Sequence, residues 1–182
     1  MSKNIILLGP SGAGKTSTAQ LLSEVLSLPC LDCDSIIEAK AGQTIAALFE
    51  EQGEEVFRAL ENQLLDDLIA NMAIANQRNS AQVIACGGGL PIGAGNMDKL
   101  KTLGQTIFLT AKVETLAKRI GSQKNRPLLL AEKPEAVFAN IDRLLTIRQS
   151  TYEQAHLTID TENKTVAEVV AEIQRILTNT TL

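Results

Sequence analysis

The chain has 182 residues, a length that suits one domain, and 45% of them are hydrophobic, which is typical of a folded globular protein rather than a disordered one. The net charge of −4 argues against a nucleic-acid partner, because a phosphate backbone selects a basic face, and an anionic substrate would therefore need locally placed arginines. Neither a signal peptide nor an apolar run long enough to span a membrane is visible, so we expect a cytoplasmic protein without a membrane partner, and we expect a monomer.

The first feature along the chain is a glycine-rich segment, Gly-Pro-Ser-Gly-Ala-Gly-Lys-Thr, at residues 9–16. It follows an apolar run at 5–8 and precedes a helical pattern that extends to Leu26, which is the strand, loop and helix order of a P-loop. Backbone N–H groups and a helix N-terminus hold a polyphosphate in such a loop. We expect Lys15 to reach the β- and γ-phosphates of a nucleotide and the Thr16 hydroxyl to hold Mg²⁺. A glycine-rich turn without a ligand is the alternative, which the full pattern disfavours.

Two aspartates follow a very short second strand at residues 30–31. Asp32 and Asp34 are two residues apart, so in an extended segment both carboxylates point to one face. At the carboxyl end of a strand in an open α/β sheet, that face overlooks the ligand crevice. Alternatively, Asp34 is only the N-cap of a helix over 35–40 that Gly42 closes. The residues themselves leave both roles open, and the two roles can coexist.

A short helix capped by Thr44 is expected to end near Gly53, and a long amphipathic helix follows it. The apolar stripe of this long helix is typical of a core-facing surface and includes Phe57, Leu60, Leu64 and Leu68. Arg58 lies beside the stripe. On its local context alone, Arg58 is most simply a surface partner of Glu54 or Glu61, which are one helical turn away.

The third strand, at 82–86, runs directly into Gly87-Gly88-Gly89. Three glycines allow a ligand to approach the backbone closely, although a flexible strand-to-helix turn has the same composition. A helix over 96–103, a strand over 106–109 and a helix over 112–120 follow this turn.

Residues 122–133 form the longest irregular stretch, with Arg126 between a polar start and an apolar end. This composition suits a mobile lid over phosphates, and it also suits a plain surface loop. A helix begins at Pro134 and continues to about Ser150, with Arg148 near its C-terminus, where a cation is favourable in any case. The last strand is expected at 157–159.

The final helix begins with a capping box formed by Thr165 and Glu168. Strands therefore alternate with helices throughout, which predicts an α/β fold of three layers: a parallel sheet with helices on both faces, in one domain over residues 1–182. The three cysteines, Cys30, Cys33 and Cys86, are interpreted as small buried hydrophobes rather than as a redox or zinc site. His156, which precedes the last strand, is interpreted as structural.

The order of these motifs resembles the shikimate kinase family along nearly the whole chain. The P-loop alone is shared by very many proteins, and the combination is what is specific. The matching segments are Gly-Pro-Ser-Gly-Ala-Gly-Lys-Thr at 9–16, Asp-x-Asp at 32–34, Gly-Glu-Glu-Val-Phe-Arg-Ala-Leu-Glu at 53–61, Gly-Gly-Gly at 87–89, Arg-Pro-Leu-Leu at 126–129 and Arg148-x-x-x-Tyr152.

The resemblance implies ATP-dependent phosphorylation of the 3-hydroxyl of shikimate, in the route to chorismate and the aromatic amino acids. It also implies a P-loop kinase fold like that of the nucleoside monophosphate kinases, with a five-stranded parallel sheet and a lid at about 121–133. A substrate-binding segment would extend over about 32–62. The implied ligands are shikimate, ATP and Mg²⁺.

The resemblance further implies roles for single residues. Asp34 would hold the reacting hydroxyl and take its proton, Arg58 and Arg148 would clamp the substrate carboxylate, and Gly88 would contact the ring. Asp32 would order Mg²⁺ through water, together with Thr16.

On the nucleotide side, Lys15 and Arg126 complete the catalytic set with Asp34, and Arg126 is the cation of the lid. Arg119 matches the family's arginine beside adenine, at a position that is less firmly aligned. The implied ATP contacts are Gly12, Ala13, Gly14, Lys15, Thr16, Ser17, Arg119 and Arg126.

Two positions depart from the family pattern around the glycines. Cys86 precedes them, where many relatives have a small or hydroxyl residue, and Leu90-Pro91 follows, where a small residue and then valine are more usual. Both flank the substrate wall and bear on substrate preference. The alternatives are a gluconate kinase-like enzyme that phosphorylates another small metabolite, and a P-loop binding protein that has lost catalysis.

Overall fold

The computed structural model describes residues 4–75, 81–120 and 134–179, and its centre is a five-stranded parallel sheet in the order β2-β3-β1-β4-β5. Every strand pair is parallel, which confirms the α/β prediction. The strands are β1 (Asn4–Leu8), β2 (Cys30–Asp32), β3 (Val83–Ala85), β4 (Gly104–Thr110) and β5 (Leu157–Asp160).

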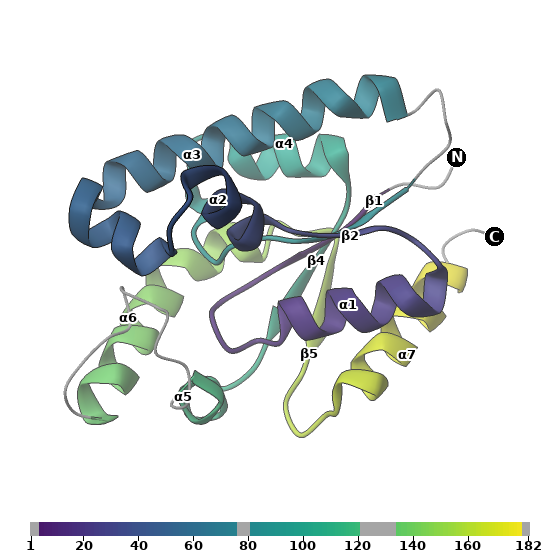
Figure 1. Cartoon of the computed structure of the whole chain (residues 1–182). Helices are drawn as coiled ribbons and strands as arrows, with labels where there is room; N and C mark the ends of the chain where they lie inside the picture. Colours follow the sequence, from purple (N-terminus) through teal and green to yellow (C-terminus); the bar gives the residue numbers. More distant parts are fainter. Residues whose placement is uncertain (1–3, 76–80, 121–133, 180–182) are drawn as a thin grey trace.

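Helices form the two outer layers (Figure 1). They are α1 (Lys15–Leu26), α2 (Cys33–Ala41), α3 (Ile45–Ala75), α4 (Asn96–Leu103), α5 (Val113–Ile120), α6 (Pro134–Tyr152) and α7 (Val166–Asn179). A short 3₁₀ helix, η2 (Leu90–Ile92), lies between β3 and α4. In the part of the chain that the structure describes, no helix combines the length and the apolar character needed to cross a membrane.

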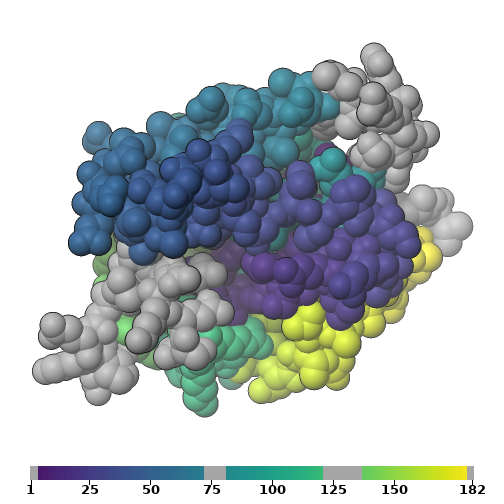
Figure 2. All heavy atoms as spheres, in the orientation of Figure 1, coloured from purple at the N-terminus to yellow at the C-terminus, as the bar shows by residue number. Residues whose placement is uncertain are grey.

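The central strand β1 contributes to a separate core on each face of the sheet. Ile5 and Leu7 belong to one core with residues of α1, α5 and α7, whereas Ile6 and Leu8 belong to the other with residues of α2, α3 and α4. This alternation follows from the period of two along a strand, and burial on both faces explains why β1 is apolar at four consecutive positions. Figure 2 shows α1 at the surface between α2 with the start of α3 on one side and α7 on the other.

Several predicted boundaries of helices and strands are confirmed, and others differ because they depend on contacts that the sequence does not reveal. α4 begins and ends at the predicted residues, α1 ends at Leu26 as predicted, and β1 covers the predicted apolar run and Asn4 before it. Gly53 has φ 85° and ψ 171°, so the helical geometry breaks there, as the predicted division of α3 into two helices requires. β3 is shorter than predicted and β4 is longer. The helix η2 was not predicted; Pro91 lies in its first turn, where the missing N–H costs nothing.

Three further expectations concern single residues. Cys33 and Cys86 are buried as expected, but Cys30 is exposed on the edge strand β2, so its prediction as a buried hydrophobe was wrong. The ring of His156 lies beside β4, where its Nδ1 accepts the backbone N–H of Thr106 at 3.1 Å. The predicted capping box is formed: the Thr165 N–H donates to Glu168 at 2.7 Å, and the Glu168 N–H donates to Thr165 Oγ1 at 3.3 Å.

Candidate active site

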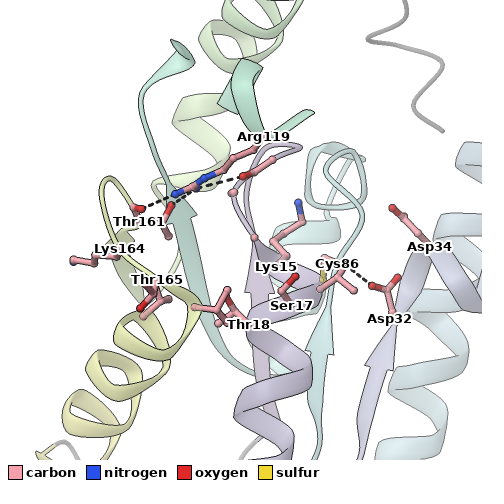
Figure 3. A pocket seen from close by; sticks show the side chains of 16 residues that line it. Lys15, Ser17, Thr18, Asp32, Asp34, Cys86, Arg119, Thr161, Lys164 and Thr165 are labelled. Carbon is pink, nitrogen blue, oxygen red and sulfur yellow. Dashed lines mark hydrogen bonds between the residues drawn. The ribbon is translucent and has the colours of Figure 1, made fainter. Parts of the chain in front are cut away.

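A cavity of about 370 Å³ lies at the carboxyl end of the sheet, where the P-loop joins β1 to α1. This is the end at which ligands bind in open parallel sheets. Figure 3 shows the side chains of the lining: Asp32 and Asp34 lie on one side of Lys15, and Arg119, Thr161, Lys164 and Thr165 lie on the other. The lining residues are Gly12, Ala13, Gly14, Lys15, Thr16, Ser17, Thr18, Asp32, Asp34, Cys86, Arg119, Thr161, Lys164, Thr165, Val166 and Val169.

The P-loop adopts the conformation that its glycines permit. Gly12 and Gly14 have φ of 82° and 89°, a region that other residues rarely adopt. Gly14 caps α1 without a side chain, so the first-turn amides of α1 point into the loop together with the positive end of the helix dipole. Lys15 is buried, and its ammonium donates to the carbonyls of Gly9 and Pro10 at 2.9 Å each. The loop is therefore an anion-binding cradle with a fixed cation.

The side-chain oxygens of Thr16 and Asp32 lie together at the P-loop. The Thr16 hydroxyl donates to Asp32 Oδ2 at 2.7 Å, although the residues are 16 positions apart. A hydroxyl and a carboxylate are hard oxygen donors of the type that Mg²⁺ selects, so the residues present fit the predicted metal.

The structure corrects the capping role considered for Asp34. Asp32 is the N-cap of α2: its backbone is extended, its Oδ1 accepts the Ser35 N–H at 3.2 Å, and the helix begins at Cys33, two residues before the predicted start. Asp34 therefore lies in the first turn of α2 and faces the cavity. Asp32 therefore caps α2 with Oδ1, while its Oδ2 accepts the Thr16 hydroxyl at the position predicted for the metal.

The Asp34 carboxylate lies directly against the glycine triplet at the end of β3. A Cβ added to Gly87 would collide with Asp34 Oδ1 and would lie 3.2 Å from Glu61 Oε1. A Cβ on Gly89 would collide with the Arg58 guanidinium, and one on Gly88 would lie 3.4 Å from the Gly9 carbonyl of the P-loop. The triplet thus lets Asp34, Arg58 and the P-loop converge on one short segment.

Arg58 projects from α3 and forms ion pairs with both predicted glutamates. It contacts Glu54 at 2.7 Å and Glu61 at 2.5 Å. The Glu54 side chain is 51% exposed, so that pair contributes little, whereas the Glu61 side chain is only 2% exposed. Three of the five N–H donors of the guanidinium serve these carboxylates, which leaves a fixed face for another anion.

Glu61 is a residue of this site that the sequence interpretation treated only as a surface partner. Burial raises the pKa of its carboxyl, and the charge of Arg58 opposes part of that rise. Asp34 and Glu61 both lie at Gly87, Arg58 pairs with Glu61, and Arg148 reaches the Gly88 carbonyl. The four charged groups therefore lie around one short segment. Among the described residues, Glu61 Oε1 is a buried side-chain oxygen without a hydrogen bond.

Arg148 and Tyr152 reach the same segment from the end of α6. The Tyr152 hydroxyl donates to the Gly88 carbonyl at 2.6 Å, and Arg148 Nη1 lies 3.5 Å from the same oxygen. Tyr152 is fully buried and stacks on Phe108, with ring centroids 5.2 Å apart. Burial raises the pKa of its phenol, so the hydroxyl keeps its proton and remains a donor.

On the side of the cavity away from Asp34, Arg119 joins the P-loop to the segment after β5 (Figure 3). Its guanidinium donates to Thr161 Oγ1 and to the Thr161 carbonyl at 2.9 Å each, and to the Gly12 carbonyl at 3.4 Å. Thr161, Lys164 and Thr165 also line the cavity, and none of them was predicted. The capping box was the available signal, because it placed a helix N-terminus just after the last strand.

The predicted residues thus meet at one end of the sheet, with one exception. The predicted ATP contacts at 12–17 and Arg119 line the cavity, as do Asp32 and Asp34; Arg58, Gly88 and Arg148 lie in the adjoining glycine segment. Arg126 and the proposed lid at 121–133 lie outside the described residues.

Comparisons with known proteins agree with this geometry. The family model for shikimate kinase matches residues 11–178. Proteins described as shikimate kinase include one from Thioalkalivibrio sulfidiphilus, 37% identical over 96% of this chain and 86% of its own length, and one from Acinetobacter baumannii, 40% identical over 97% and 93%. A solved structure of shikimate kinase from Acinetobacter baumannii in complex with shikimate superposes with a TM-score of 0.89 at 36% identity, and it covers 100% of this chain and 96% of that one. The chain belongs to the shikimate kinase family.

Proposed function

We propose that this chain carries out the reaction of its family, the ATP-dependent phosphorylation of shikimate at its 3-hydroxyl, which gives shikimate 3-phosphate and ADP. The observation that carries the proposal is the convergence at Gly87–Gly89: Asp34, Arg58 and the P-loop all lie against this segment, so an acceptor bound there is next to the phosphate cradle. Phosphoryl transfer depends mainly on such positioning and on charge neutralisation.

The acceptor would be held by groups of complementary charge in the segment at 32–62 and at the end of α6. Arg58 and Arg148 would bind the carboxylate of shikimate, since a guanidinium fork matches a carboxylate. Gly88 would contact the ring. Asp34 would accept a hydrogen bond from the 3-hydroxyl and take its proton late in the reaction, because the transition state of phosphoryl transfer is loose.

The nucleotide would lie along the P-loop with its phosphates on the backbone at 12–17 and on Lys15, and with its base beside Arg119. Thr16 would ligate Mg²⁺, and Asp32 would hold it through water. When bound, Mg²⁺ supplies positive charge that screens the phosphate oxygens from the incoming hydroxyl. We also propose that Arg126 adds a further cation from a lid at 121–133, whose closure would exclude water.

Two alternatives remain distinguishable by experiment. A solved gluconokinase from Sinorhizobium meliloti superposes with a TM-score of 0.55 at 17% identity, a likeness that shows the fold alone. An inactive P-loop binder would have no need of the arrangement in which Asp34 faces the phosphate cradle. The expected cytoplasmic location and monomeric state stay predictions, for which cell fractionation and gel filtration are the tests.

The test of the proposed function is to identify the product and to remove its proposed base. Incubation with MgATP and shikimate should give ADP and a single monophosphate ester, with the phosphorus coupled to the proton on C3 in NMR spectra. Asp34→Asn should lower kcat by about 10²- to 10⁴-fold, the usual contribution of a positioned acid or base, with ATP binding unchanged. The exposed Asp98→Asn is the matched control on α4. Normal turnover by Asp34→Asn would contradict the role given to this carboxylate.

A further inference from the structure

Gly88, which would contact the shikimate ring, belongs to a tight turn at residues 87–92, which we call the glycine turn. The Leu90 N–H donates to the Gly87 carbonyl at 3.2 Å, and the Ile92 N–H donates to the Gly89 carbonyl at 2.9 Å. These bonds close the turn on itself. They do not attach it to α3, from which Arg58 projects.

One buried amide makes that attachment. Asn96, the first residue of α4, is 2% exposed. Its Nδ2 donates to the Leu90 carbonyl at 2.9 Å and to Asn62 Oδ1 at 2.8 Å. An amide nitrogen carries two hydrogens, so both are used, one on the glycine turn and one on α3. Figure 1 shows α3 and α4 side by side over one face of the sheet, and the hydrogen bond between Asn96 and Asn62 joins these two helices.

The local chain is shaped around this amide. A Cβ on Gly93 would collide with Asn96 Nδ2 and would lie 3.3 Å from Asn62 Oδ1, so glycine at 93 leaves the space that the bridge occupies. The Asn96 N–H donates to the Gly93 carbonyl at 2.9 Å, which holds the start of α4 in place. A buried polar side chain with both donors used specifies one arrangement, because any shift would leave a buried donor unpaired.

The position of the bridge relates it to substrate binding. Asn62 is the residue after Glu61 and lies one helical turn beyond Arg58 on α3. Arg58 lies against Gly89, and Glu61 lies near Gly87, so the spacing between α3 and the glycine turn sets the spacing between Arg58 and Gly88. A change of that spacing would separate the carboxylate-binding group from the ring contact.

We propose that Asn96 is a positioning residue for the acceptor: through Asn62 and the Leu90 carbonyl it fixes the glycine turn to α3 and thereby holds Gly88 and Arg58 at the distance that shikimate requires. This inference rests on the proposed function. It assigns Asn96 no contact with ATP, since neither Asn96 nor Asn62 lines the cavity at the P-loop.

The test compares Michaelis constants for the two substrates in variants of the full chain. Asn96→Ala should raise KM for shikimate about tenfold or more, and Asn62→Ala about three- to tenfold, with KM for ATP within about twofold of wild type, since a buried hydrogen bond has effects of this size. Asn62→Asp keeps an oxygen acceptor for Asn96 Nδ2 and should restore KM for shikimate to near the wild-type value. Gln63→Ala, at the exposed position next to Asn62, is the control and should change neither constant.

Because Asn96 is buried, its alanine variant could fail to fold, and Asn62, which is exposed, then provides the test by itself. The proposal is overturned if Asn62→Ala and Asn62→Asp have the same KM for shikimate, or if KM for ATP rises as much as KM for shikimate. A lower melting temperature with unchanged constants would also overturn it, because it would indicate packing alone. Wild-type protein that turns over gluconate but binds no shikimate would refute the proposed function and this inference with it, whereas active wild-type protein with insensitive variants would refute the inference alone.

Discussion

Among the glycines at 87–89, Gly87 and Gly89 are required because a side chain there would collide with its neighbours, not because of backbone conformation. None of the three has a left-handed φ. A Cβ on Gly87 would collide with Asp34, and a Cβ on Gly89 would collide with Arg58. The triplet was expected to let a ligand approach the backbone; in the structure, the protein's own charged side chains approach it first.

Gly87→Ala should therefore act through Asp34. The added methyl group would displace the carboxylate, and a displacement of about 1 Å at a reacting group lowers the rate about 10²-fold, so kcat should fall by that order while KM for ATP stays within about twofold. Gly88→Ala is the informative comparison, since its Cβ would make an ordinary contact of 3.4 Å with the Gly9 carbonyl. It should retain more kcat and raise KM for shikimate. Equal kcat losses in the two variants would argue against a specific effect on Asp34.

Glu61 should make stability depend on pH in a predictable direction. Its folded-state pKa is raised above the ordinary 4.5, chiefly by burial, so its contribution to stability is fully present below about pH 4.5 and is lost as the pH rises through the folded-state pKa. Glu61→Gln does not titrate. Relative to wild type, its free energy of unfolding should increase between pH 4 and pH 7.

Urea unfolding at several pH values measures this difference, with the exposed Glu55→Gln as the control on the same helix. A difference that is constant with pH, or one that falls as the pH rises, would be inconsistent with a burial-dominated carboxyl. The same variant should raise KM for shikimate, because Arg58 would lose its buried partner and keep only the exposed Glu54.

The sequence predicted roles for the P-loop, the Asp-x-Asp pair and the arginines, because the residue types and spacing within each motif indicate its chemistry. The pairing of Arg58 with Glu61 was predicted, but the burial of Glu61 and the contacts of Asn96 and Tyr152 were not. Tyr152 meets Gly88 across 64 positions and Asn96 meets Asn62 across 34. A single sequence does not reveal contacts between such distant residues. Arg58 could therefore be interpreted only as a surface partner of nearby glutamates, although its guanidinium both pairs with them and faces the site.

At the scale of elements, helix ends with a capping signature were predicted best. The capping box at Thr165 and Glu168 fixed the start of α7 correctly. The start of α2 was placed two residues late because either aspartate could cap it, and only the bond from Ser35 identifies Asp32. The bounds of β3 were predicted too wide and η2 was not predicted, because both depend on strand pairing and on the turn at the glycines.

Thr165→Ala should measure how much the capping box contributes to the free energy of unfolding. Loss of a threonine N-cap costs about 1 kcal/mol, and α7 packs on α1 in the core beneath the P-loop, so the free energy of unfolding should fall by about that amount in urea titrations. Thr178→Ala is the control, because its Oγ1 only bonds the Gln174 carbonyl within the last turn of the same helix. Equal effects of the two variants would mean that the capping box contributes nothing specific. Since Thr165 lines the cavity, KM for ATP is the second quantity to follow.

At the scale of the whole molecule, alternation of strands and helices predicted a parallel sheet, and a run of four apolar residues predicted the strand before the P-loop. The strand order β2-β3-β1-β4-β5 could not be predicted from the residues themselves, because the apolar content of the strands does not identify which of them is central. That order explains the site. Because β1 and β3 are neighbours, the P-loop after β1 and the glycines after β3 emerge side by side, and Asp32 at the end of β2 and Asp34 just after it lie next to them.

The central claim, that the phosphate cradle and the acceptor segment together form a shikimate kinase, is tested most directly by ADP release with MgATP. Initial rates should be compared for shikimate, quinate, gluconate and no acceptor in one coupled assay. The account predicts saturable ADP release that depends on shikimate and is near background with the other three. Turnover with gluconate in place of shikimate, or no turnover by folded protein that binds ATP, would contradict it.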